Sequence, residues 1–239
     1  MSSYEQRKQA AIHFRKETER RINDALQRYS SWLNSKNMRL EFPIDIDRMI
    51  EQWLGLGLYI GSIRDEFKRD EVENLRDVWG ALFYDADFGG WMIFIDEELE
   101  QSYREGPLRF TQAHEVVHYL CHIPEAERDP SSQPGLFGAE EMAKTYNRIF
   151  CRKGEENSYK EREADYGAAC LLAPADEVIR RFDSWAKEAD CGAGRITPGN
   201  VLHADAIDTL REQFGLSRKA MEIRLDELGL TESADQQLL

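Results

Sequence analysis

Two histidines four positions apart, with a glutamate directly after the first, form the most distinctive polar motif of this chain. They stand in the segment His114-Glu115-Val116-Val117-His118. On a helix, positions four apart lie one turn apart and about 40° apart around the axis, so both imidazoles point to one side. Two imidazole nitrogens placed in this way can bind one tetrahedral Zn²⁺ ion. Glu115 lies about 100° further round, where its carboxylate can reach a metal-bound water molecule instead of the metal.

The residues around this segment predict that it is a helix. Gly106-Pro107 is a suitable beginning, because proline is favoured in a first turn, where its missing N–H needs no partner. We expect the helix to end near His122, ahead of Pro124. The alternative interpretation is two ordinary surface or core histidines beside a solvated glutamate. Apolar residues recur at helical spacing between these limits and form one stripe: Phe110, Ala113, Val117, Leu120 and Cys121.

A later segment offers the third ligand that a catalytic zinc site needs. Such a site takes three protein ligands and leaves the fourth position open for water. If residues 161–174 form a helix, Glu161 and Asp165 share a face with small alanines that let another helix approach closely. We expect Glu161 to bind the metal and Asp165 to accept the outer N–H of a ligating histidine. Glu163 is the weaker ligand candidate, because it points away from this face.

The two segments together resemble the ImmA/IrrE family of zinc metallopeptidases, whose pattern is Phe-Thr-x-Ala-His-Glu-x-x-His, then Glu-x-x-Ala-Asn/Asp, then Leu-Leu-x-Pro. Here residues 110–118 read Phe-Thr-Gln-Ala-His-Glu-Val-Val-His, residues 161–165 read Glu-Arg-Glu-Ala-Asp, and residues 171–174 read Leu-Leu-Ala-Pro. The resemblance extends over about residues 42–230 and implies a gluzincin-like zincin with one Zn²⁺ ion. Two departures are Gly167, where the family usually has an aromatic residue, and a longer separation between the motifs.

The resemblance implies peptide-bond hydrolysis, in which Zn²⁺ on His114, His118 and Glu161 would lower the pKa of a bound water molecule and polarise the scissile carbonyl. Glu115 would take a proton from that water and later give it to the leaving amine. The implied substrate is a regulatory protein, such as a transcriptional repressor or an antitoxin. The alternative is a non-catalytic zinc-containing module that acts by binding such a partner. The presence of Glu115 argues against it, because a structural zinc site needs no base.

Other polar side chains have less certain places in this scheme. A donor should stabilise the tetrahedral oxyanion, and the sequence does not choose between Tyr119, Tyr166 and His203. His122 is four residues past His118, not the six of a third metzincin histidine, so we expect it beside the ligands or in a structural role.

The order of the expected elements indicates an α+β fold, mainly helical, with a small antiparallel sheet of about three strands beside the metal-binding helix. The strands are expected at residues 56–60, 80–84 and 90–96, with a five-residue hairpin loop between the last two. Trp91 and Ile93 are the candidates for pairing with extended substrate if their strand lies at an edge. The alternative is a core strand.

Helices are expected on both sides of this part of the chain. Residues 1–40 should form an N-terminal helix with an apolar seam, residues 41–174 the zincin-like domain, residues 175–230 a C-terminal helical region, and residues 231–239 a flexible tail. The segment 123–158, with a possible short helix at 139–150, is either a lid or a surface excursion. A DNA-reading helix pair near the C-terminus is disfavoured, because its basic residues are balanced by acidic ones.

The composition of the chain indicates which classes of partner it can bind and in which cellular compartment it is expected. Lys and Arg number 31 against 45 Asp and Glu, a net charge of −14, which argues against direct nucleic-acid binding. The four cysteines have no Cys-x-x-Cys spacing, so we expect reduced thiols in the cytoplasm. No apolar run approaches the roughly 18 residues of a membrane span, so no membrane partner is expected.

Overall fold

Helices form most of the protein in the computed structural model, which describes residues 3–66, 78–85, 87–101, 105–123, 149–152, 159–190 and 196–231. The mainly helical α+β class predicted from the sequence is confirmed. The elements, in order, are α1 (Ser3–Ser35), α2 (Ile46–Arg48), the π-helical turn η1 (Met49–Trp53), β1 (Gly57–Gly61), α3 (Ile63–Glu66), β2 (Val78–Asp85), β3 (Gly90–Asp96), α4 (Glu97–Gln101), α5 (Glu105–His122), β4 (Ile149–Arg152), α8 (Tyr159–Leu172), α9 (Ala175–Glu188), α10 (Val201–Phe214) and α11 (Arg218–Glu227).

The sheet is mixed, with the strand order β1-β3-β2-β4. Strands β2 and β3 form the expected antiparallel hairpin, with Leu82 opposite Ile93. Strand β1, however, runs parallel to β3, so the prediction of a wholly antiparallel sheet is wrong. The reason is connectivity: a short hairpin imposes antiparallel pairing on its two strands, but β1 pairs with a strand that does not follow it directly.

A fourth strand, β4, comes from the segment between the two motif helices. Ile149 and Phe150 belong to this strand, where the sequence analysis placed the end of a short helix, and Phe150 lies opposite Ala81 of β2. An Ile-Phe pair fits a pleated strand that completes the hydrogen bonds of β2. The rest of that expected helix, and most of the segment considered as a lid, lie outside the described residues.

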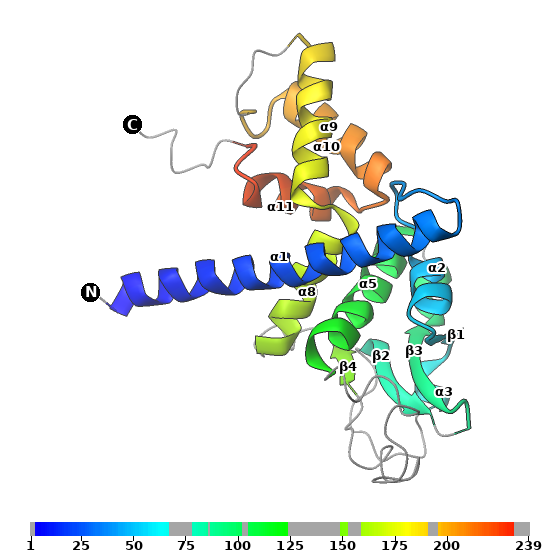
Figure 1. The fold of residues 1–239 in the computed structure, drawn as a ribbon. Helices are drawn as coiled ribbons and strands as arrows, with labels where there is room; N and C mark the ends of the chain where they lie inside the picture. The colour runs from blue at the N-terminus through cyan, green and yellow to red at the C-terminus, as the bar shows by residue number, and fades with distance from the viewer. Residues whose placement is uncertain are drawn as a thin grey trace.

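Helix α1 crosses the molecule between the C-terminal helices and the part that contains the sheet, as Figure 1 shows. It packs along α8 and contacts α5 and η1. Its apolar seam is buried as predicted, with side chains between 0% and 6% exposed: Ile22, Leu26, Tyr29 and Leu33.

A buried arginine of the last helix, Arg224, contacts both the end of α8 and helix α1. Arg224 of α11 is 1% exposed, and its Nε donates to the backbone oxygen of Ala173, at the turn between α8 and α9, over 3.0 Å. Its Nη2 lies 3.5 Å from Glu19 of α1. The other basic residues of α11 also face acidic partners, because Arg218 pairs with Asp208 and Lys219 with Glu222. None of the described helices is long and apolar enough to cross a membrane.

Helices α5 and α8 approach each other closely at Gly167. A Cβ atom at this position would lie 2.7 Å from Cγ1 of Val117 and 3.1 Å from its Cγ2. Val117 is fully buried and has a branched side chain with little freedom to move away. The missing side chain at Gly167 therefore allows the crossing that brings the two motif segments together.

We expect Gly167→Ala to lower the stability of the protein. Crowding against Val117 should cost about 1–3 kcal/mol, which exceeds the gain of up to about 1 kcal/mol from replacing a helical glycine with alanine. In a Val117→Ala background the clash is removed, so the same substitution should become neutral or stabilising. Denaturant unfolding of the four proteins in this cycle would measure both effects, and equal effects in the two backgrounds would contradict the close contact.

Candidate metal centre

Three side chains from α5 and α8 converge on one point. Nε2 of His114 and Nε2 of His118 are 2.9 Å apart. The carboxylate of Glu161 completes a triangle, with Oε2 at 3.2 Å from His114 Nε2 and Oε1 at 3.3 Å from His118 Nε2. The two histidines are at most 2% exposed and the Glu161 side chain is 13% exposed. These three residues could hold one metal ion.

The dimensions and protonation of this triangle fit a divalent cation such as zinc. Zinc with bonds of about 2.0–2.1 Å to a tetrahedral set of nitrogen and oxygen ligands separates those ligands by about 3.4 Å. Burial lowers the pKa of His118 to about 4, so its imidazole is neutral near pH 7. Although burial raises the pKa of Glu161, the hydrogen bonds with His114 and His118 outweigh this and lower it to about 2. Neutral imidazole and ionised carboxylate are the forms that bind metal.

Each histidine of the triangle is held from behind through its other ring nitrogen. Nδ1 of His114 lies 2.9 Å from Oδ1 of Asp165, which is one helical turn after Glu161. Nδ1 of His118 lies 2.8 Å from Nδ1 of His122. Such outer partners fix the tautomer and the ring orientation of a metal-binding histidine. The structure thus places Asp165 against His114 and His122 against His118.

Glu163 also belongs to this constellation, although the sequence analysis considered it only as a weaker ligand. Its Oε2 lies 3.1 Å from Nε2 of His122, and its side chain is 3% exposed. A residue that points away from the metal can therefore still contact a histidine behind it. The available signal was His122 itself, which is one helical turn past His118 and needs a partner if it is buried.

Glu115 is the one carboxylate of the described site that lacks a hydrogen-bond partner. It is fully buried, and neither Oε1 nor Oε2 has a partner among the described residues. Burial raises its pKa to about 8, with His114 lowering it and Glu161 raising it further. A buried carboxylate that makes no hydrogen bond is costly. The arrangement is therefore suited to a group that completes the site, such as a cation with its water.

Strand β2 leaves room for the Glu115 carboxylate by having a glycine opposite it. A Cβ atom at Gly80 would lie 2.7 Å from Glu115 Oε1 and 2.7 Å from Cγ2 of Thr111. The ladder between β2 and β4 is irregular between Val78 and Gly80. The position of Glu115 thus depends on a strand more than thirty residues earlier in the chain.

The three candidate oxyanion donors make contacts elsewhere. The Tyr119 ring packs edge-on against Trp91 with centroids 6.3 Å apart. The Tyr166 ring lies under the guanidinium of Arg15 at 5.3 Å, and burial raises its pKa to about 12. Nδ1 of His203 accepts a hydrogen bond from the backbone N–H of Gly199 over 3.4 Å. None of these contacts involves a residue of the triangle, so the oxyanion donor stays a prediction.

Of the two alternatives for Trp91 and Ile93, the structure does not show the edge strand. They belong to β3, which is paired with β1 on one side and with β2 on the other. Both side chains are buried, at 3% and 0% exposed. The alternative of a core strand applies, because β1 occupies the edge that β3 would otherwise present. Among the described strands, β1 and β4 are the outer ones.

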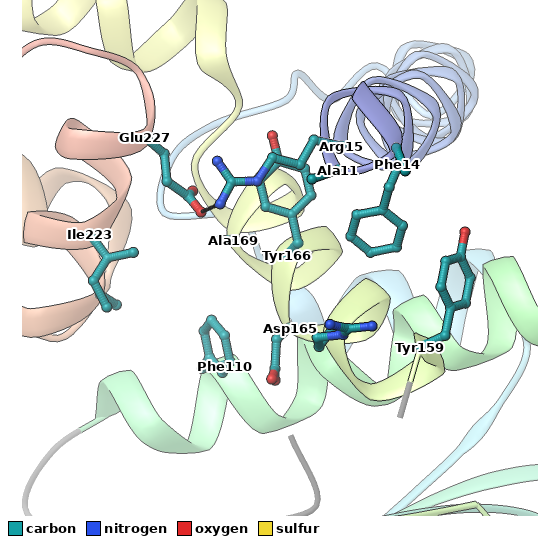
Figure 2. A pocket seen from close by; sticks show the side chains of 13 residues that line it. Ala11, Phe14, Arg15, Phe110, Tyr159, Asp165, Tyr166, Ala169, Ile223 and Glu227 are labelled. Atoms are coloured by element: carbon teal, nitrogen blue, oxygen red, sulfur yellow. Dashed lines mark ion pairs between the residues drawn. The ribbon is translucent and has the colours of Figure 1, made fainter. Parts of the chain in front are cut away.

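A cavity of about 850 Å³ lies beside the metal centre, between α1, α8, α11 and the first part of α5. Figure 2 shows that Phe14, Phe110 and Tyr166 surround it, and that the ion pair between Arg15 and Glu227 spans one side. Asp165 also lines this cavity. The carboxylate that holds His114 is therefore accessible from a space lined mainly by apolar and aromatic side chains.

Comparison with known proteins adds no assignment. No family model matches the chain, and no curated protein matches it. The candidate metal centre rests on the contacts of His114, His118 and Glu161, which could hold one metal ion.

We expect Glu161→Ala to abolish stoichiometric zinc binding, because it removes one of three ligands. The loss should exceed the roughly 10–100-fold that follows from removing an outer partner. Arg162→Ala is the matched control, since Arg162 is the exposed next residue on the same helix. Competition with a chromophoric chelator would measure both affinities, and wild-type affinity in Glu161→Ala would exclude the proposed ligand set.

Proposed function

We propose that the protein is a zinc-dependent endopeptidase. The observation that carries this proposal is the buried Glu115 carboxylate, which has no described hydrogen-bond partner and lies on the same helix as two ligands of the triangle. A zinc site with three protein ligands leaves one position open, whereas structural sites use four. A base placed next to such an open position is the combination that hydrolysis requires.

The side chains of the site have two roles in the proposed reaction, metal binding and proton transfer. His114, His118 and Glu161 would hold the zinc ion, which would supply Lewis acidity when bound. Glu115 accepts a proton from the attacking water and delivers it to the leaving amine. Its raised pKa follows from burial, because this position solvates a negative charge poorly. A nearby cation favours the ionised carboxylate, which is the form that can act as a base.

The substrate that we propose is a regulatory protein, such as a transcriptional repressor or an antitoxin, which is what the resemblance to the ImmA/IrrE family implies. An extended segment of such a protein can bind by pairing with the edge of a sheet. Strand β4 is the candidate edge, because it is the outer neighbour of β2. Its residue Cys151 pairs with Gly80, and Gly80 is the residue that lies against the Glu115 carboxylate. This assignment replaces β3 as the strand that faces substrate.

Glu115→Gln should retain stoichiometric zinc and lose proteolysis, because the amide cannot accept the proton. Loss of a general base typically lowers the rate by about 10²–10⁴-fold. The assay incubates purified protein with candidate repressors encoded beside it, with and without a chelator, and follows cleavage by mass spectrometry. Full activity of Glu115→Gln would refute the base assignment. A zinc-loaded wild type that binds such a partner without cleaving it would instead indicate the non-catalytic module.

Gly80→Ala should impair the same step without removing a ligand. The added methyl group would force the Glu115 carboxylate, 2.7 Å away, to move. We expect kcat to fall at least about tenfold, since misplacement of a reacting group by 1 Å can cost about 100-fold, while zinc stoichiometry stays at one. Gly90→Ala is the control, because its Cβ would meet only the Phe88 ring, at 3.2 Å. Equal kcat values for the two variants would contradict this role of Gly80.

A further inference from the structure

A line of buried polar contacts leads from the metal centre to the N-terminal helix. It begins at His118, passes through His122 and Glu163, and reaches Thr18 on α1. Thr18 and His118 are fully buried, and Glu163 is 3% exposed. Thr18 and Glu163 are 145 positions apart in the chain. The contact therefore connects α1 with the interior of the metal-binding part.

The direction of the hydrogen bonds along this line follows from metal binding. If Nε2 of His118 binds the metal, its proton is on Nδ1 and is donated to Nδ1 of His122, 2.8 Å away. His122 then has its own proton on Nε2 and donates it to Glu163 Oε2 over 3.1 Å. Neutral histidine has one donor and one acceptor nitrogen, so a single arrangement satisfies both contacts. The line ends on the carboxylate of Glu163, whose Oε2 accepts this hydrogen bond from His122.

The charge of Glu163 is compensated by α1. Its Oε1 lies 3.3 Å from Oγ1 of Thr18 and 3.5 Å from Nη1 of Arg21. The Thr18 hydroxyl has one proton, which it can donate to Glu163 or to the backbone oxygen of Phe14 at 3.0 Å. Donation to the carboxylate would be charge-assisted, while the Phe14 oxygen is the nearer of the two acceptors, at 3.0 Å against 3.3 Å. Without α1, Glu163 would lose both of these partners.

We propose that α1 contributes to zinc binding. Glu163 and Thr18 are positioning residues that couple the docking of α1 to the binding of zinc at the metal centre. The proposal rests on the zinc site proposed above, but it does not depend on peptidase activity. Coupling of this kind is reciprocal, so zinc strengthens the docking of α1 by the same factor by which docked α1 strengthens zinc binding. A partner that displaced α1 would thereby weaken the site.

The test measures both sides of this coupling in the full-length protein. Zinc affinity is obtained by chelator competition, and the docking of α1 by hydrogen exchange of the amides of residues 14–21 with and without zinc. Glu163→Gln should lower zinc affinity roughly 10–100-fold, and Thr18→Val roughly fivefold or more. Thr18→Ser is the matched control, because it keeps the hydroxyl and should keep wild-type affinity.

In the wild type and in Thr18→Ser, zinc should increase the protection of residues 14–21. In Glu163→Gln and Thr18→Val this zinc-dependent increase should be lost, although circular dichroism shows a folded protein. Thr18→Val keeps the shape of the side chain, so it tests the coupling even if Glu163→Gln does not fold. Nitrogen NMR of the zinc-loaded wild type should show His122 protonated on Nε2 alone.

The two proposals can fail separately. If the wild type binds zinc and both Glu163→Gln and Thr18→Val bind it equally tightly, the coupling is refuted while the zinc site stands. Unchanged zinc-dependent protection of α1 in these variants, or a proton on Nδ1 of His122, would also refute it. A wild type that binds no zinc would overturn both proposals.

Discussion

The close crossing of α5 and α8 is the constraint on which the rest of the site depends. Two imidazoles on one helix cannot hold a catalytic ion alone, and the carboxylate that joins them comes from a helix whose axis must lie near. Gly167 permits that approach, because any side chain there would meet Val117. The contacts of Glu161 and Asp165 with His114 both follow from this single geometry.

Burial determines the protonation states of the side chains in the site. The two histidines of the triangle are excluded from water, so His118 stays neutral, while Glu161 keeps its charge through the imidazoles that face it. Glu115 accepts no hydrogen bond from the described residues. These two carboxylates of the site therefore differ in environment: Glu161 is ionised, the form that binds a cation, whereas Glu115 is destabilised as an anion because it is buried without a hydrogen-bond partner among the described residues.

The features that were predictable from the sequence are those set by short-range periodicity. The spacing of His114 and His118 defines a helix face, and the spacing of Glu161 and Asp165 defines the face that meets it. Features that depend on distant pairing were missed. The parallel partner of β3 and the strand at Ile149 arise from sheet assembly, and the contact between Glu163 and Thr18 exists because α1 packs beside α8. No local pattern contains that information.

The buried position of Arg224 has a consequence for how such a protein could be rearranged in evolution. Its guanidinium holds the carbonyl of Ala173, immediately after the helix that carries Glu161, and also approaches Glu19. A recombination event that transplanted the chain only as far as α9 would leave this carbonyl unsatisfied and α1 without one of its cationic neighbours. The metal-binding segments and the last helix should therefore be inherited together.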